Sequence, residues 1–516
     1  MQRSHLILIG SVLVAGALLV LLMRSEPSRS YRAIESSEGS NASQSSAAPI
    51  LLFCAASNRG AMEAIRADYQ RECRRSVDIQ YGASQTLLSS MEVSGEGDLF
   101  LPADNSFIAM ARDKDLIAEV LPVASMQAVV AVLRDNPKGI VQFNDLLGHK
   151  LRVVQANPDA AAIAKLTREH LTPLGLWDKL ASVTAAYRTT VNEAANDVVV
   201  GAADAAIVYD AVLHTYPALT AVQLPELDKA VSHISLAVVK SSQQPEAALH
   251  FARYVTARDR GLKHYQEQGF NVTTGDLWSD RPELSIFAGS MLRPAIDETI
   301  TAFEAREGVR VSRVYNGCGI LVAQMKAGQH PDAYFACDKE FMNSVPDLFP
   351  NPVDVSQNEL VILVQKGNPH NIRSLRDLGR SGVRVGIGHE KQCAMGWITQ
   401  NTLREGGIEK EVMANVTVQT PTGDMLVNQL RVGGLDAAVA YLSNAAGAAE
   451  HLDAIQITGI PCSVATQPFA VAVDSPHAQL AMRLFERLQS AESKRTFMAE
   501  GFKWSADLPA AGEHVR

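Results

Sequence analysis

The sequence lacks the features that mark nucleic-acid-binding proteins and several common enzyme classes. Its formal net charge is −9, whereas binding to nucleic-acid phosphates needs basic stripes on the protein surface. It contains no Walker loop, no zinc-protease helix and no Gly-x-Ser-x-Gly nucleophile turn. These absences argue against a nucleic-acid partner and against catalysis by those motifs. A small anionic ligand stays possible, because backbone amides and hydroxyl groups bind anions without net positive charge.

Cysteine is also scarce, with six residues in a chain of 516. None precedes Cys54, so an N-terminal lipoprotein anchor is not expected. A chain of this length, with 47% hydrophobic residues, can bury large cores and does not depend on disulfides for stability. The even number permits disulfides in an oxidising compartment without requiring them.

The N-terminal segment has too few polar residues for a globular surface. From Leu6 to Met23 it is apolar apart from Ser11, and a helix of this length spans about 27 Å, enough for a bilayer core. No small-x-small cleavage site follows, which favours an uncleaved single-pass anchor over residues 1–24 rather than a cleaved signal peptide. The arginines at 24, 29 and 32 leave the positive-inside signal ambiguous, so this segment alone does not fix on which side of the membrane the rest of the chain lies.

An internal repeat organises the remainder of the chain. Five segments of the first half recur in the second half in the same order; for example, the segment from Leu51 resembles the one from Leu284. A period of more than 200 residues indicates a duplicated domain rather than a solenoid. The predicted organisation is a Ser- and Glu-rich flexible stalk, two domains and a short tail, with boundaries at 25–48, 49–277, 283–506 and 507–516.

Within each copy, short apolar runs rich in β-branched residues alternate with segments of helical period. This alternation predicts an α/β fold with mostly parallel sheets covered on both faces. Ligands of such sheets bind beyond the carboxyl ends of the strands, where loops lead into helix N-termini.

Two serines of the first copy stand at such turns. Ser57 follows the strand predicted over 51–56, and Ser84 follows the strand predicted over 77–81. Hydroxyl groups beside the free amides of helix N-termini suit a desolvated oxyanion. Each serine could equally be a simple helix N-cap that binds no ligand.

These segments resemble the periplasmic molybdate- and tungstate-binding proteins of ABC importers. The resemblance is carried by Ala-Ala-Ser57, Gly-Ala-Ser84, the segment 97–104 and Ala-Ile-Val-Tyr209. It implies two tandem bilobal domains of the periplasmic binding type that hold a tetrahedral oxyanion and are not enzymes. It also implies an ABC permease as partner and a location in the periplasm or outside the cell. No cofactor is implied.

The resemblance further implies a set of ligand-binding residues for the first copy. Two serines, a tyrosine hydroxyl and two backbone amides hold the anion in that family, and the matching positions here are Ser57, Ser84, Tyr209, Ala161 and Val191. The family's usual Val-Pro-Ala-Gly turn is replaced here by residues 159–162, Asp-Ala-Ala-Ala. This departure makes the amide near Ala161, and the identity of the anion, less defined.

The second copy has the same positions with different chemistry. Ser290 and Tyr441 are kept, Cys318 replaces the second serine, and Gly423 stands at the position of Val191. The turn that should present an amide contains Cys393. The second copy is therefore expected to bind an altered ligand.

Cys337 and His389 lie near the same expected cleft, and four interpretations of this group stay open. The thiols are buried packing residues or form a local disulfide. Alternatively, Cys318, Cys393, His389 and Cys337 bind a soft metal such as copper or zinc. A catalytic Cys–His pair is a third interpretation, and an oxyanion site with a thiol in place of one hydroxyl is the fourth.

Two other functions compete with transport. A membrane-tethered sensor or receptor would present the same binding fold to a partner protein, and the apparent permanent anchor favours it. A thiol- or metal-dependent enzyme would be built on the second copy.

Overall fold

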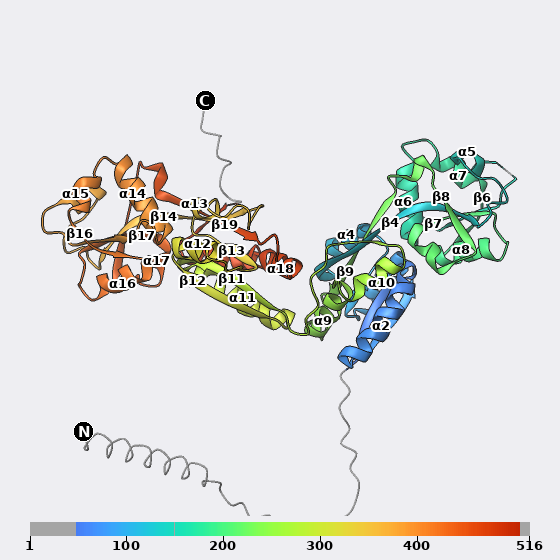
Figure 1. Cartoon of the computed structure of the whole chain (residues 1–516), viewed down its shortest axis with the longest axis horizontal. Helices are drawn as coiled ribbons and strands as arrows, with labels where there is room; N and C mark the ends of the chain where they lie inside the picture. Colours follow the sequence, from blue (N-terminus) through green and yellow to red (C-terminus); the bar gives the residue numbers. More distant parts are fainter. Residues whose placement is uncertain (1–47, 149, 506–516) are drawn as a thin grey trace, which may run out of the picture. The chain divides into compact units, whose positions relative to one another are not determined.

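The computed structural model describes residues 48–148 and 150–505 (Figure 1). The predicted anchor (1–24), nearly all of the predicted stalk (25–48) and the tail (507–516) lie outside these residues. Across the described ranges, no helix is both long and apolar enough to cross a membrane.

The first repeat contains ten strands in one connected sheet. In chain order, the strands are β1 (Ile50–Ala55), β2 (Val77–Gly82), β3 (Leu99–Leu101), β4 (Ile117–Leu133), β5 (Val153–Ala156), β6 (Thr184–Arg188), β7 (Ala205–Tyr209), β8 (Leu219–Val222), β9 (Val231–Val239) and β10 (Asn271–Val272). The α-helices are α2 (Arg59–Cys73), α3 (Ser84–Ser94), α4 (Asn105–Asp113), α5 (Phe143–Leu146), α6 (Ala162–Leu171), α7 (Trp177–Val183), α8 (Val191–Val199), α9 (Pro245–Val255) and α10 (Gly261–Glu267). Short 3-10 helices are η1 (Ala56–Asn58), η2 (Asp210–Thr215) and η3 (Pro225–Leu227).

The second repeat has the same number of strands in the same order. They are β11 (Glu283–Gly289), β12 (Arg310–Asn316), β13 (Ala333–Phe335), β14 (Val353–Gln365), β15 (Val385–Gly388), β16 (Val416–Thr420), β17 (Ala437–Tyr441), β18 (Leu452–Gln456), β19 (Val464–Val471) and β20 (Lys503–Trp504). The α-helices are α11 (Arg293–Glu307), α12 (Cys318–Lys326), α13 (Lys339–Met342), α14 (Ala394–Glu405), α15 (Glu409–Met413), α16 (Gly423–Arg431), α17 (Leu442–Ala446), α18 (Ala478–Leu488) and α19 (Ala491–Ala499). The 3-10 helices are η4 (Ser290–Leu292), η5 (Leu375–Gly379) and η6 (Pro461–Ser463).

The strand orders of the two repeats correspond position by position. The order is β2-β1-β3-β9-β4-β7-β5-β6 in the first repeat and β12-β11-β13-β19-β14-β17-β15-β16 in the second. Each repeat has its own buried hydrophobic cluster, formed by residues between Ile50 and Phe270 in one and between Leu284 and Phe502 in the other. The duplication predicted from the sequence is therefore present in the fold.

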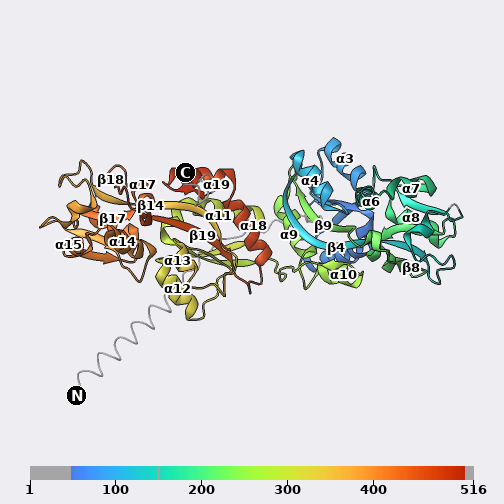
Figure 2. The same cartoon turned by 90° about the horizontal axis from the view of Figure 1, so that it is seen from above.

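A single long strand joins the two lobes of each repeat. The first part of β4 pairs with β9, and its last residues pair with β7 and β8 of the other lobe. Figure 2 gives the view from above, in which β4 and β9 run alongside each other. Strand β14 has the same double role in the second repeat, with β19 on one side and β17 and β18 on the other. Each repeat is thus bilobal, with its lobes joined through continuous strands.

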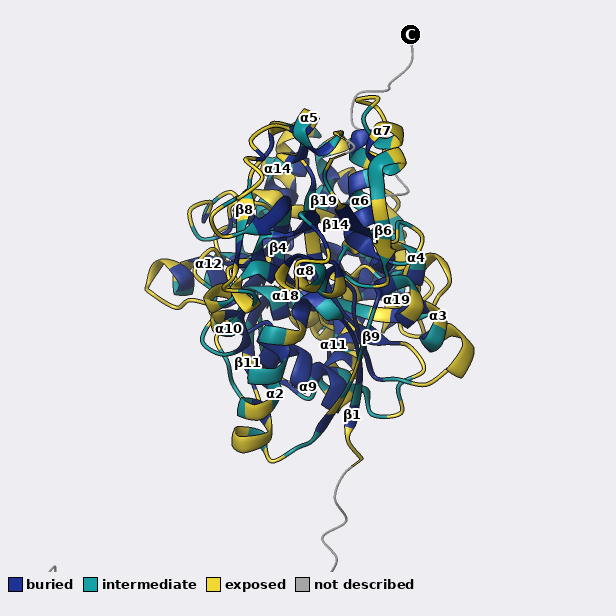
Figure 3. Cartoon of the chain, turned by 90° about the vertical axis from the view of Figure 1, so that its right-hand side faces the viewer, coloured by how far each residue is buried: buried dark blue, intermediate teal, exposed yellow. Residues whose placement is uncertain are grey.

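The sheets are mixed, and the expectation of mostly parallel sheets was wrong. Strand β1 is parallel to β2 and β3, and β5 is parallel to β6 and β7. The joining strands β4 and β9 instead run antiparallel to each other and to their neighbours. The apolar sequence of a fully buried strand is similar in both arrangements, so its pattern does not reveal the direction. Figure 3 shows how strands in the interior are buried while exposed residues gather on the outer turns and helix faces.

A buried ionic cluster connects the two repeats. Glu307, at the end of α11, is 1% exposed and accepts two hydrogen bonds from Arg483, at 2.7 and 3.1 Å. Arg253 of α9, in the first repeat, donates to the Glu307 side chain at 3.1 Å and to its backbone oxygen at 2.6 Å. Burial alone would favour the protonated carboxyl, but Arg483 and Arg253 hold the pKa of Glu307 below its ordinary value.

Replacing Glu307 by alanine is expected to destabilise the protein strongly. The substitution leaves two buried guanidinium groups without their shared carboxylate, and breaking a buried ion pair in this way typically costs about 3–5 kcal/mol. Urea denaturation followed by circular dichroism measures the change. The matched control is Glu63→Ala, because Glu63 and Arg66 form an exposed pair for which a loss below about 1 kcal/mol is expected. Equal, small losses for both variants would contradict the assignment of Glu307 as a central contact.

Candidate functional site

The two predicted serines of the first repeat lie side by side at the carboxyl ends of neighbouring strands. Strands β1 and β2 are parallel, and their register places Ala55 opposite Gly82. Ser57 follows β1 within η1, and Ser84 is the first residue of α3. Both side chains are buried, with relative exposures of 8% and 1%. The parallel pairing of the two strands is what brings the two turns to one edge of the sheet.

The opposite lobe contributes Tyr209 and the start of two helices. Tyr209 is the last residue of β7, Ala161 immediately precedes α6, and Val191 is the first residue of α8. A hydrogen bond from the Gln85 amide to the Ala160 carbonyl, at 3.1 Å, connects the two lobes beside these residues.

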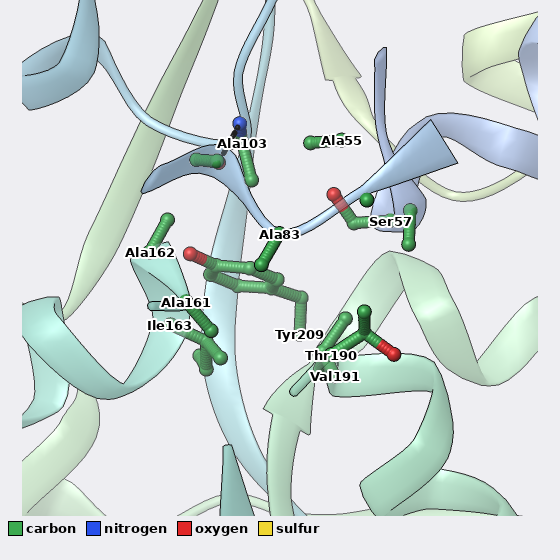
Figure 4. Close-up of a pocket in the computed structure, with 13 residues that line it drawn as sticks. Ala55, Ser57, Ala83, Ala103, Ala161, Ala162, Ile163, Thr190, Val191 and Tyr209 are labelled. Carbon is green, nitrogen blue, oxygen red and sulfur yellow. Dashed lines mark hydrogen bonds between the residues drawn. The ribbon is translucent and has the colours of Figure 1, made fainter. Parts of the chain in front are cut away.

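These residues surround one small cavity (Figure 4). Its volume is about 20 Å³, somewhat more than the roughly 10–15 Å³ that one water molecule needs by the same measure. In this conformation it has room for a small ion but not for a large organic solute. All five positions expected to bind the ligand line it, together with eight others: Ala55, Ala56, Gly82, Ala83, Ala103, Ala162, Ile163 and Thr190.

The cavity is polar without being charged. Its lining consists of Ala, Gly, Ser, Thr, Tyr, Ile and Val residues. The N-terminal ends of α3, α6 and α8 border it, and the first N–H groups of a helix have no acceptor within the helix. These amides and the helix dipoles favour an anion at this position.

The hydroxyl groups in the cavity differ in their hydrogen bonding. The Ala103 amide donates to Ser84 Oγ at 3.0 Å, which leaves the Ser84 hydroxyl free to donate its own proton. Ser57 Oγ and the Tyr209 hydroxyl are buried and find no partner among the described residues. Burial raises the pKa of the Tyr209 hydroxyl, so it stays protonated as a donor. Buried unpaired polar groups are costly, so these two hydroxyls are available to donate to a ligand or a water molecule in the cavity.

The amide of Ala161 is not available in the way that the resemblance implies. It donates to the Asn157 carbonyl at 2.8 Å. The next residues, Ala162 and Ile163, also line the cavity and belong to the first turn of α6, whose amides lack acceptors in the helix.

Sequence reasoning did not identify Thr190 or Ala103. Thr190 caps α8 by accepting a hydrogen bond from the Glu193 amide at 3.3 Å, and the Thr-x-x-Glu pattern was a signal that could have located this helix start. Ala103 acts only through its backbone, and no side-chain pattern reveals it.

In the second repeat, three cysteines occupy positions that line the cavity of the first repeat. Cys318 begins α12 as Ser84 begins α3, and Cys393 immediately precedes α14 as Ala161 precedes α6. Cys337 lies two residues after β13, as Ala103 lies two residues after β3. All three are buried and are free thiols. The corresponding cleft is thus rich in sulfur.

The hydrogen bond that orients Ser84 is retained with sulfur. The Cys337 amide donates to Cys318 Sγ at 3.0 Å. A side chain at Gly289 would clash with Cys337, because its Cβ would lie 2.0 Å from the Cys337 sulfur and 3.2 Å from that of Cys318. The first repeat has Ala56 at the position of Gly289. Compared with the first repeat, the second repeat therefore lacks a methyl group at position 289 and has an additional sulfur atom beside it, at Cys337.

The other expected residues of the second site lie at places in the fold similar to those of Ser57, Val191 and Tyr209 in the first repeat. Ser290 begins η4, Gly423 begins α16, and Tyr441 ends β17. The Tyr441 hydroxyl is buried without a partner among the residues that the structure describes. Its pKa is raised by burial and by the neighbouring Cys337 and Asp338.

The surroundings favour the protonated form of the Cys337 and Cys393 thiols. A hydrogen bond with Cys318 and burial raise the pKa of Cys337 well above its ordinary value, and burial raises the pKa of Cys393 to about 11. His389 is less closely involved, since its Nδ1 accepts from the nearby Lys391 amide at 3.3 Å. Within 48–148 and 150–505, one Cys/His/carboxylate group has all its ligand atoms within 4.8 Å of one another, and it is Cys73, His250 and Asp280 rather than this cluster.

The sequence of each repeat matches one family, described as bacterial extracellular solute-binding protein, over residues 50–271 and 284–503. The chain belongs to this bacterial extracellular solute-binding protein family. The two matches confirm the family and the tandem arrangement expected from the sequence.

Individual relatives of this solute-binding protein each match about half of the chain. A putative binding protein of Haemophilus influenzae is 24% identical over 241 residues, which is 45% of this chain and 93% of that protein. The molybdate-binding protein ModA of Mycobacterium bovis is 26% identical over 221 residues, which is 42% of this chain and 83% of that protein. The solved structure of the periplasmic molybdate-binding protein of Azotobacter vinelandii matches 44% of this chain and all of that one, with 18% identity and a TM-score of 0.39.

Proposed function

We propose that the protein is the solute-binding component of an ABC-type importer and that its first repeat binds a tetrahedral oxyanion of the molybdate or tungstate type. Membership of an extracytoplasmic solute-binding family supports a binding role rather than an enzymatic one. Relatives named as molybdate-binding proteins support the ligand class. The observation that carries the proposal is the small uncharged cavity with the buried, unpaired hydroxyls of Ser57 and Tyr209.

The anion loses its hydration on entry and receives neutral donors in exchange. The Ser57, Ser84 and Tyr209 hydroxyls donate to its oxygens, and the first amides of α6 and α8 add further donors. Helix dipoles favour the negative charge, so no countercharge is needed. The bound anion does not need to be protonated.

Binding also favours closure of the lobes. Ser57 and Ser84 belong to one lobe and Tyr209 to the other, so only the closed arrangement lets all three contact the same ion. A ligand that binds the closed state more tightly shifts the population toward it. Closure therefore requires a change of backbone conformation in the joining strands β4 and β9.

Molybdate or tungstate is expected to raise the melting temperature of the full-length protein, as measured by differential scanning fluorimetry. Isothermal titration is expected to give about one ion per chain. Tyr209→Phe removes one donor to a charged ligand, worth about 1.5–3 kcal/mol, so the affinity should fall about 10- to 100-fold. Ser57→Ala combined with Ser84→Ala should abolish the thermal shift.

The matched control is Ser290→Ala, which changes the equivalent serine of the second repeat and should leave oxyanion affinity unchanged. A full-length protein that shows no shift with molybdate, tungstate, sulfate or phosphate would reject the oxyanion proposal.

For the second repeat we propose a different, thiophilic ligand such as a soft metal ion. The supporting observation is that Cys318, Cys337 and Cys393 stand at the positions equivalent to Ser84, Ala103 and Ala161, which line the cavity of the first repeat. Thiolates select soft or borderline metals. The three sulfur atoms do not all lie within 4.8 Å of one another, so binding one ion through all three would require this repeat to rearrange, with His389 as a further candidate ligand.

Restoring the residues of the first repeat should convert the second site. In the quadruple variant Cys318→Ser, Cys337→Ala, Cys393→Ala and Gly289→Ala, in which the last change refills the space of the lost sulfur, we expect isothermal titration to give two oxyanions per chain instead of one. If the unmodified protein already binds two, the second repeat is an oxyanion site despite its thiols and the thiophilic proposal fails.

We also propose that residues 1–24 are an uncleaved membrane anchor. Fractionation of cells that express the full-length protein should then recover it with the membranes, and a variant that begins with a cleavable signal peptide joined at residue 25 should be soluble in the periplasm. Recovery of the full-length protein in the soluble periplasmic fraction would contradict the anchor.

A further inference from the structure

A second group of metal-ligand side chains lies away from both clefts, beside the segment that joins the repeats. Cys73 is the last residue of α2, His250 lies in α9, and Asp280 lies between β10 and β11. Their ligand atoms are all within 4.8 Å of one another, and no other group of three or more Cys, His, Asp or Glu residues in the described ranges meets this limit. Helices α2 and α9 pack together in the first repeat (Figure 1).

The His250 ring is held in one orientation by its neighbours. Its Nδ1 is 2.8 Å from the hydroxyl of Tyr69, and its Nε2 is 3.0 Å from Asp280 Oδ1. Tyr69 is 1% exposed, and the Trp278 ring meets His250 edge-on, with the centroids 5.0 Å apart. When Nδ1–H donates to the Tyr69 oxygen, the lone pair of Nε2 faces Asp280. Histidines that bind metals are oriented by such a partner on the second ring nitrogen.

The protonation states also suit a cation. Burial lowers the pKa of His250, so the imidazole is neutral at physiological pH, as a metal ligand must be. Burial, together with the negative charges of Asp280 and Glu72, raises the pKa of Cys73 to about 11. A bound divalent ion would reverse this effect and release the thiol proton.

The site is accessible. Cys73, His250 and Asp280 line an open pocket that also contains Tyr69 and Arg75. The Arg75 guanidinium donates to Gln244 Oε1 at 2.6 Å, and its positive charge contributes to lowering the pKa of His250. The Asp280 side chain is 86% exposed and has the freedom to adjust to an ion.

We propose that Cys73 Sγ, His250 Nε2 and the Asp280 carboxylate bind a zinc ion, with water from the pocket in the fourth position. One sulfur, one nitrogen and one oxygen ligand form a mixed set that suits Zn²⁺, which is borderline in softness and accepts four ligands. The ion would replace the His250–Asp280 hydrogen bond and tie the joining segment to α2 and α9. Its role is structural and independent of the oxyanion site.

The test uses the full-length protein after treatment with a chelator. Elemental analysis after reloading should find one zinc bound through this site, and Co²⁺ should give the near-ultraviolet absorption of a thiolate ligand. Because the free thiols of the second cleft could also bind cobalt, these substitutions are made in the Cys318→Ser, Cys337→Ala and Cys393→Ala variant, where Cys73→Ser and His250→Ala should each abolish the absorption band. Asp280→Asn, which alters an exposed side chain, should weaken zinc binding without affecting the fold. Tyr69→Phe should keep the stoichiometry and weaken binding about tenfold, the effect expected of a positioning residue.

Cys462→Ser is the matched control, because Cys462 is a half-buried thiol in the second repeat, and it should leave the band unchanged. A band that survives Cys73→Ser but disappears in the Cys318, Cys337 and Cys393 triple variant would place the metal in the second cleft and overturn the proposal. The absence of both zinc and the cobalt band would also overturn it. Because Cys73→Ser should not alter the thermal shift with molybdate, the two proposals fail separately.

Discussion

The organisation of each repeat depends on one long strand that belongs to both lobes. Strand β4 leaves its partner β9 at Gln127 and pairs with β7 from Ala128 onward, so a single backbone carries hydrogen bonds in two lobes. Because this strand continues from one lobe into the other, the strand-to-helix turns of the two lobes face each other. The same constraint recurs in β14 and β19. The joining strands fix the position of one lobe relative to the other. They therefore determine which side chains, distant in sequence, can line the same cavity.

The chemistry of the two clefts diverges on an almost unchanged backbone. The amide of Ala103 supports a hydroxyl in the first repeat, and the amide of Cys337 supports a thiol in the second. Sulfur is larger and more polarizable than oxygen, and the glycine at position 289 provides the space for it. Changes at a few positions can thus replace hard donors by soft ones while the fold, the tyrosine and the helix starts are retained. Duplication followed by such changes is a direct route to two ligands on one chain.

The sequence was sufficient for the duplication, the alternation of strands and helices, and the side chains of the first cavity, because periodicity and short motifs encode these features. It was insufficient for the strand directions, since β4 and β9 are apolar runs whose pattern fits either direction. It could not show that the Ala161 amide is occupied by Asn157 or that Ala103 supports Ser84, because those are backbone contacts. The approach of Cys73, His250 and Asp280 depends on packing among three distant segments, which no local pattern contains.

The path of the chain has a consequence for biosynthesis. The first lobe of each repeat is interrupted: β1–β3 are made early, but β9 follows only after the whole second lobe has been inserted. Contacts between segments so far apart form slowly, since loop closure precedes any gain from pairing. The inserted lobe can assemble while the early strands still expose apolar edges, which are prone to aggregation. A newly made chain would therefore need protection twice, once for each repeat, until the last strand of that lobe arrives.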